Sequence, residues 1–148
     1  MNTLLEKLSI IIASLWVGGL WAMLMVTTIL FNKIPSTYIA GAIVIDMFSF
    51  MNLFGIASSI ILLSIGIRAD GISYLKKIIC WLLVILMIII AISYFGINPL
   101  LESIKIQALP KEVMESVFAE RFSTWHGIAS VAYLIECFLG IFLLLKIR

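Results

Sequence analysis

Four long apolar runs fill most of this chain, at roughly residues 8–31, 39–67, 75–97 and 122–145. About 20 apolar residues of α-helix cross a bilayer core, and each run is at least that long. The pattern predicts an all-α integral membrane protein, a four-helix bundle that forms a single transmembrane domain over residues 1–148. The short polar link at 32–37 predicts that the first two spans form an antiparallel hairpin.

Composition supports a lipid environment. Hydrophobic residues make up 64% of the chain and charged residues only 12%, about half the charged share of a soluble domain. A net charge of +2 with scattered basic residues excludes nucleic acid as an expected partner. The run from Leu8 to Phe31 is too long for the apolar part of a signal peptide, and no Ala-x-Ala site follows it, so we expect a retained helix.

The segment at 99–121 is the largest expected loop. Asn98-Pro99 is predicted to end the third helix, because proline disfavours helix in the residue before it. Pro110 suits a helix start, and four apolar residues then fall on one face: Val113, Met114, Val117 and Phe118. The pattern predicts a short amphipathic helix at the membrane surface between the third and fourth spans, with a solvated linker as the alternative.

Basic residues indicate the orientation. One side of the membrane would carry Lys7, Arg68, Lys76, Lys77, Lys146 and Arg148. The other would carry fewer basic residues, diluted by glutamates: Lys33, Lys105, Lys111 and Arg121, with Glu102, Glu112, Glu115 and Glu120. We therefore expect a multi-pass protein of a bacterial inner membrane with both termini in the cytoplasm.

Two carboxylates, Asp46 and Glu136, interrupt the apolar runs. Ionisable residues inside a membrane are costly and are by default candidates for function, although a protonated acid can also be purely structural. Counting along the helices predicts an outer polar layer with Asp46, His126, Asn98, Thr27 and Thr28, and a deeper layer with Asn52 and Glu136. Ser49 and Tyr133 lie on the same stripes. We expect the first, second and fourth spans to enclose these residues and the third to face lipid.

Small residues suggest where helices pack closely. Ser14, Gly18 and Ala22 recur at every fourth position of the first span, with Gly19 beside them. Gly127 and Gly140 are the corresponding glycines of the last span. Such residues let helix backbones approach in membranes. The alternative for Gly18 and Gly19 is a tight approach beside the deeper polar layer.

Metal chemistry has few candidate ligands. His126 is the only histidine, and a soft Cu(I) site with Met23 or Met47 is conceivable. Cys137 is too far along the same helix, at about 16 Å, to share an ion with His126. A haem would also need His126 as its axial ligand. No nucleophile–base pair, phosphate-binding loop or dinucleotide-binding turn is present, so no firm metal or cofactor is expected and an enzyme is the weaker hypothesis.

Three segments together resemble a known family. The stretch Leu15-Trp16-Val17-Gly18-Gly19-Leu20-Trp21, the Asn98-Pro99 pair and the stretch Phe122-Ser123-Thr124-Trp125-His126-Gly127 occur in order on a four-span chain. This pattern is similar to the transmembrane-protein-205-like family of bacterial membrane domains. The resemblance implies a four-helix integral membrane protein and no particular reaction. Ala129 and Tyr133 stand where that family often has serine and asparagine. Copper-resistance D proteins and haem-linked protoporphyrinogen oxidases are more distant, because their early histidine is missing here.

Three functions remain open from the sequence. The polar interior would bind or pass a small solute, a proton or a metal ion. Alternatively, the protein is an accessory subunit of a larger membrane complex, or a homo-oligomer, with its apolar third helix as the docking face. The third hypothesis is a membrane redox protein with haem or copper at His126.

Overall fold

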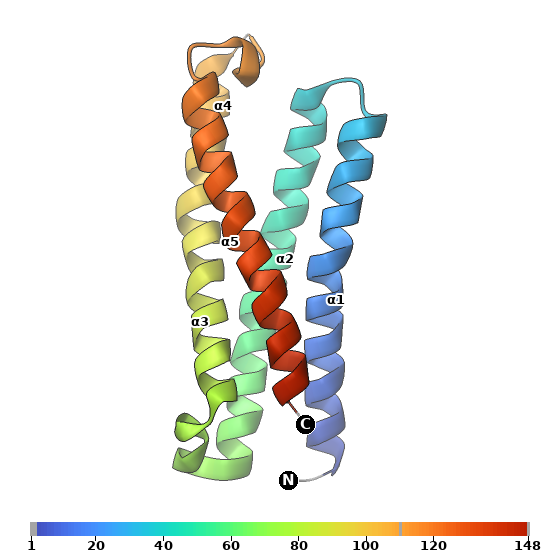
Figure 1. Ribbon diagram of the computed structural model, residues 1–148, viewed down its shortest axis with the longest axis vertical. Helices are drawn as coiled ribbons and strands as arrows, with labels where there is room; N and C mark the ends of the chain where they lie inside the picture. Colours follow the sequence, from blue (N-terminus) through green and yellow to red (C-terminus); the bar gives the residue numbers. More distant parts are fainter. Residues whose placement is uncertain (1–2, 110, 148) are drawn as a thin grey trace.

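The computed structural model describes residues 3–109 and 111–147, and nearly all of them are helical. Within these residues, four helices are long and apolar enough to cross a membrane: Leu4–Lys33, Ile39–Lys76, Ile78–Ala108 and Ala119–Lys146. They stand side by side, with both chain ends at the same end of the bundle (Figure 1). The predicted all-α membrane bundle is confirmed. We call the end with the chain termini the terminal end, and the opposite end the loop end.

The first two spans form the predicted hairpin. Helix α1 (Thr3–Lys33) is joined to α2 (Thr37–Asp70) by a short link at the loop end. The Ser36 hydroxyl accepts a hydrogen bond from the Ile39 backbone N–H at 3.3 Å, which caps the start of α2.

At the terminal end, α2 turns sharply into a 3₁₀ helix, η1 (Gly71–Lys76). Gly71 has a φ of 60°, a left-handed value that glycine adopts without steric cost. The Lys77 ammonium pairs with the Asp70 carboxylate at 2.7 Å across this turn. The chain then re-enters the bundle as the third span.

The third span is longer than predicted. Helix α3 (Ile78–Ile92) passes through a π-helical turn, η2 (Ser93–Ile97), into α4 (Asn98–Ala108). The prediction that Asn98-Pro99 ends this helix is wrong, because the Asn98 N–H bonds back to the Ser93 carbonyl across the wider turn. Pro99 then falls in the first turn of α4, where its missing N–H costs nothing.

The predicted surface helix is much shorter than expected. Between α4 and α5 (Ala119–Lys146) the structure has only a single 3₁₀ turn, η3 (Val113–Glu115). The helical part of the 99–121 segment is instead α4, which extends the third span. Pro110, the expected helix start, lies outside the described residues.

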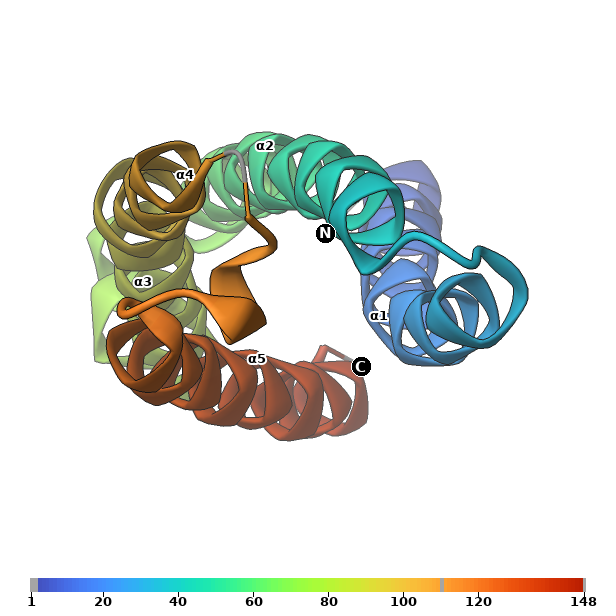
Figure 2. The same cartoon turned by 90° about the horizontal axis from the view of Figure 1, so that it is seen from above.

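Helix α5 crosses the bundle diagonally. It begins beside α4 at the loop end and finishes near α1 at the terminal end (Figures 1 and 2). Seen along the bundle, α1, α2 and the third span follow an arc, and α5 lies across its open side (Figure 2). The crossing brings α5 close to α1 in one half of the bundle and away from it in the other.

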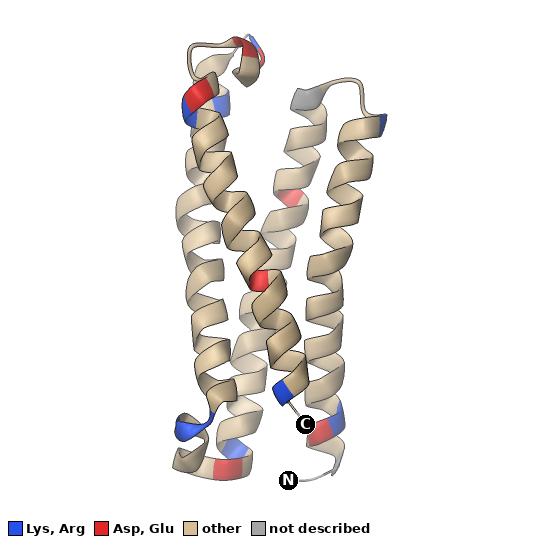
Figure 3. Ribbon diagram, in the orientation of Figure 1, with Lys and Arg blue, Asp and Glu red and all other residues tan. Residues whose placement is uncertain are grey.

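Charged residues gather at the two ends of the bundle (Figure 3). Between them, α2 and α5 each carry one acidic residue in the described chain, Asp46 and Glu136. This distribution matches an apolar band bounded by two water interfaces, as expected for spans that cross a bilayer.

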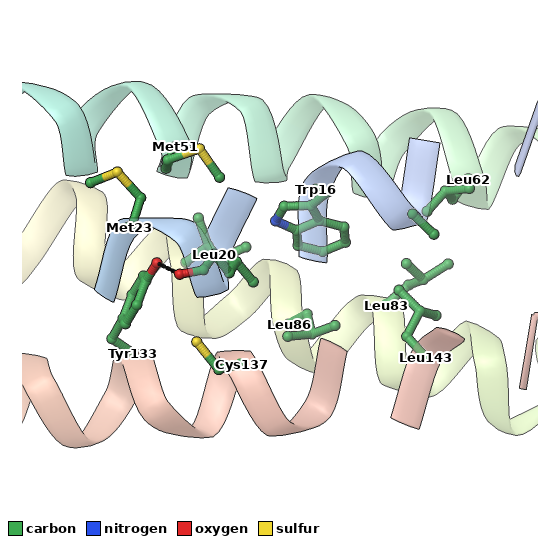
Figure 4. Close-up of a cluster of buried hydrophobic side chains, with 12 residues drawn as sticks. Trp16, Leu20, Met23, Met51, Leu62, Leu83, Leu86, Tyr133, Cys137 and Leu143 are labelled. Atoms are coloured by element: carbon green, nitrogen blue, oxygen red, sulfur yellow. Dashed lines mark hydrogen bonds between the residues drawn. The ribbon is translucent and has the colours of Figure 1, made fainter. Parts of the chain in front are cut away.

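The terminal half of the bundle is tightly packed (Figure 4). Trp16 and Leu20 of α1 meet Leu83, Leu86 and Leu143 of α3 and α5, and each of these side chains is at most 1% exposed. On the α2 side of Trp16, a Cβ placed at Gly55 would lie 2.9 Å from the indole Nε1, so only glycine leaves room for this ring.

The predicted packing residues divide into two groups. Gly19 and Gly140 are packing positions, since an added Cβ would lie 2.7 Å from Met51 Cε and 3.0 Å from Val17 Cγ2, respectively. Gly18 and Gly127 are exposed and have open space around them. Ser14 and Ala22, which were also expected at a contact between helices, lie on the same exposed face of α1 as Gly18. Among the described residues, this face does not pack against another helix of the bundle.

Candidate functional site

A cavity of about 280 Å³ lies in the loop half of the bundle. We call it the inner cavity. All four spans line it, including the third, which was predicted to face lipid and stay outside the polar interior. Its walls are mainly apolar, and its lining residues are Leu24, Thr27, Thr28, Val44, Ile45, Phe48, Asn52, Ser93, Asn98, Leu101, His126, Ala129, Ser130, Tyr133, Leu134 and Glu136.

Polar atoms without partners gather around the inner cavity. Among the described residues, four buried side-chain nitrogen or oxygen atoms have no hydrogen-bond partner. Three of them belong to cavity-lining residues of three different helices: Thr27 Oγ1 of α1, Asn98 Nδ2 of α4 and Glu136 Oε2 of α5. An unsatisfied buried polar group costs about 1–3 kcal/mol. A polar ligand or water that reached these three atoms would remove the cost of each.

Glu136 is the most deeply buried of these polar residues. Its side chain is 1% exposed, and Ser93 of the third span lies near the carboxyl and lines the same cavity. Ser93 opens the π-helical turn of the third span. The irregular turn therefore brings a serine near the carboxyl, while Oε2 has no hydrogen-bond partner among the described residues.

Tyr133 forms the wall next to Glu136. Its hydroxyl donates a hydrogen bond to the Leu20 carbonyl at 2.5 Å, which ties α5 to α1. Its ring lies edge-to-face against Phe48 of α2, with centroids 4.8 Å apart. The two rings give the inner cavity an aromatic side.

His126 stands where the inner cavity meets a second one. This outer cavity, of about 230 Å³, lies at the loop end and shares Val44, Ile45, Leu101 and His126 with the inner cavity. The imidazole stacks on the Phe122 ring at 5.8 Å between centroids and a 9° interplanar angle. His126 therefore lies between the inner cavity and the loop end.

A lysine that sequence analysis did not select lines the outer cavity. Lys105 Nζ lies 5.8 Å from the centroid of the Phe122 ring. A Cβ at Gly41 would lie 2.7 Å from the same Nζ, so the ammonium packs against the α2 backbone. Lys105 was overlooked because the third helix was expected to end before it. Ser93 was overlooked for a related reason, since the third span was expected to be apolar.

Asn52 and Asp46, both on α2, lie on different sides of the helix. Asn52 is 4% exposed and lines the inner cavity with Glu136. Asp46 is exposed and lies in a shallow groove between α1 and α2 on another side of the bundle. Placing Asp46 in one layer with His126 is therefore wrong. Ser49 is half-buried and lines neither the inner nor the outer cavity.

The predicted soft metal ligands lie apart. Met23 and Met47 line the shallow groove with Asp46, whereas His126 lines the inner and outer cavities. Within the part of the chain that the structure describes, no three His, Cys, Asp or Glu side chains are close enough to hold one metal ion. The geometry brings no copper site together at His126.

An apolar layer separates the inner cavity from a further cavity at the terminal end, of about 320 Å³ and lined partly by Glu6, Ser9, Asp70 and Lys77. Towards the terminal end lies the apolar cluster that includes Trp16, Leu83, Leu86 and Leu143 (Figure 4). These side chains close the bundle between the inner cavity and the terminal end. The inner cavity therefore continues towards the loop end through the outer cavity, and the apolar cluster separates it from the cavity at the terminal end.

A family model covers most of this architecture. Residues 11–110 match a domain of unknown function, DUF4149. The chain belongs to this family. No curated protein and no solved structure matches it. The matched DUF4149 segment contains Thr27, Asn52, Ser93 and Asn98, and it ends before α5, which contributes Glu136.

Proposed function

We propose that this protein binds a small polar solute in the inner cavity and that the solute arrives from the loop end. The observation that carries the proposal is that Thr27, Asn98 and Glu136 line one cavity and each holds a buried polar side-chain atom without a partner. Purely structural polar groups in a membrane bundle are expected to satisfy one another.

The character of the cavity walls supports the same function. Binding sites for small molecules are mainly apolar, with a few polar groups that fix the orientation of the ligand. The inner cavity has this composition, with leucine, valine and phenylalanine walls and polar atoms from three helices. The closed terminal half favours binding over a continuous pore in this conformation.

The orientation completes the proposal. The terminal end carries Lys7, Arg68, Lys76, Lys77 and Lys146, and positively charged ends of membrane proteins face the cytoplasm. The inner cavity would then open away from the cytoplasm across a bacterial inner membrane. The resemblance to the transmembrane-protein-205-like family agrees with four spans and assigns no reaction.

Cysteine labelling tests the proposal. Ala129 lines the inner cavity, and Val131, two positions along α5, is 58% exposed on the outer face of the bundle. Ala129→Cys and Val131→Cys are made in a background with Cys80 and Cys137 replaced by alanine. The purified proteins in lipid nanodiscs are treated with uncharged methyl methanethiosulfonate.

We expect the cavity cysteine to react faster, because only a hydrated thiol ionises and the thiolate is the reactive form. The lipid-facing cysteine stays protonated. Equal rates for the two variants, or no reaction at Ala129→Cys, would mean that the inner cavity is closed to solutes and would overturn the proposal.

Asp46 favours a second candidate, a subunit of a larger membrane assembly. An exposed carboxyl about nine residues inside α2, or about 13 Å along the helix, is costly against lipid unless a partner covers it. The shallow groove beside it contains Gly19, Ala22 and Met23. The docking face would then be formed by α1 and α2 and not by the third span, which the sequence suggested. It predicts that Asp46→Leu lowers the size of the assembly purified in mild detergent, and an unchanged size would count against it.

A further inference from the structure

We infer that the solute of the inner cavity is an organic monocation, a protonated or quaternary amine with an apolar body. This inference rests on the proposed function and names its ligand class. It starts from Glu136, the only carboxylate that lines the inner cavity. The side chain is 1% exposed, and Oε2 has no partner among the described residues.

No basic side chain among the described residues is found paired with this carboxyl. The ion pair found in the described chain, between Lys77 and Asp70, lies at the terminal end. His126 lines the same cavity, but it lies ten residues before Glu136 on α5, which is about 15 Å along the helix. Its ring stacks on Phe122. A cation in the cavity would supply the missing charge and stabilise the ionised carboxyl.

The surroundings select an organic cation over a metal ion. Mg²⁺ and Ca²⁺ prefer about six or more oxygen ligands, and one carboxylate with leucine and valine walls cannot provide them. By contrast, the Tyr133 and Phe48 rings contact each other and line the same cavity as Glu136, and aromatic rings attract ammonium groups. A cavity of about 280 Å³ is also far larger than a bare ion requires.

Two further polar groups fit a ligand with its own hydrogen-bonding atoms. Asn98 Nδ2 offers donors, and Thr27 Oγ1 can donate or accept. Glu136 Oε2 has no hydrogen-bond partner among the described residues, so it is the acceptor that we assign to an ammonium group. The expected ligand therefore places its positive charge at Glu136 and a hydroxyl or carbonyl group near Asn98.

Charged thiol reagents of similar size test this inference. Ala129→Cys is treated with trimethylammonioethyl methanethiosulfonate or with sulfonatoethyl methanethiosulfonate, and each rate is divided by the rate at Val117→Cys, which is 93% exposed at the loop end. We expect the cationic reagent to be favoured by about tenfold, the effect of about 1.4 kcal/mol. Glu136→Gln should remove the preference, and Asp46→Asn, the matched loss of a carboxylate outside the cavity, should leave it intact.

Direct competition separates the possible cations. Benzyltrimethylammonium should protect Ala129→Cys from the uncharged reagent, whereas its neutral isostere neopentylbenzene and potassium ions should not. Equal protection by potassium, or equal rates for the two charged reagents, would overturn the inference. If the uncharged reagent reacts but the cationic one is not favoured, the proposed solute site stands and only its ligand class falls. If no reagent reacts at Ala129→Cys, both fall.

Discussion

In the terminal half of the bundle, the four spans meet in an apolar layer through Trp16, Leu62, Leu83 and Leu143. A second cavity, lined partly by Glu6, Ser9, Asp70 and Lys77, lies beyond that layer at the terminal end. In the loop half, the same four spans separate around the inner cavity, and Thr27, Asn98 and Glu136 in its lining each have a buried polar atom without a partner. The crossing of α5 creates this difference, because α5 approaches α1 only towards its C-terminal end (Figure 1). The apolar cluster of the terminal half stabilises the bundle, whereas the buried polar atoms without partners in the loop half lower its stability.

The largest effect on stability is expected in the terminal half. Trp16→Ala should lower the free energy of unfolding by about 3–5 kcal/mol, because it removes a fully buried indole from the contact of three helices. Unfolding by sodium dodecyl sulfate in mixed micelles measures the change. Leu15→Ala is the control, since Leu15 is 63% exposed on the same helix and should change stability little. Similar losses for both variants would contradict the packed terminal half.

Glycines provide a finer test of the same packing. Gly55→Ala should destabilise the bundle by about 1–3 kcal/mol, because its methyl group would overlap Trp16 and Ile90. Gly18→Ala meets open space and should be neutral or stabilising by up to about 1 kcal/mol through helix propensity. The same unfolding assay compares them. A loss at Gly18 equal to that at Gly55 would show that the exposed face of α1 is covered.

The boundary between the halves depends on Tyr133. Tyr133→Phe removes the hydrogen bond to the Leu20 carbonyl but keeps the ring against Phe48, so we expect a loss of about 0.5–1.5 kcal/mol. If stability is unchanged, this hydrogen bond does not hold α5 to α1.

The smallest effect on stability is expected at the site itself. Glu136→Gln should change the free energy of unfolding by less than about 1 kcal/mol, in either direction, because the carboxyl lacks the partners that would make it stabilising. A loss of about 3 kcal/mol or more would instead identify Glu136 as one half of a buried pair.

The sequence predicted the fold better than the site. The length and composition of the apolar runs were sufficient to predict four spans, because the thickness of a bilayer fixes how many apolar residues a crossing helix needs. The third span ran on past Pro99 because a π-helical turn at Ser93–Ile97 accommodates the proline, and such a turn leaves no simple sequence pattern. Asn52 and Glu136 were correctly placed together, but Asp46 was not. At 3.6 residues per turn, positions 46 and 52 differ by about 120° around the helix, so one of them faces outward.

The central claim is that the inner cavity is reached from the loop end only. Ala129→Cys, together with the side markers Val117→Cys at the loop end and Ile72→Cys at the terminal end, can be labelled in vesicles of known orientation with the membrane-impermeant cationic reagent. Val117 and Ile72 are 93% and 82% exposed, so each reports its own side. We predict that Ala129→Cys is labelled only from the side that labels Val117→Cys. Labelling from the side that labels Ile72→Cys would contradict the account.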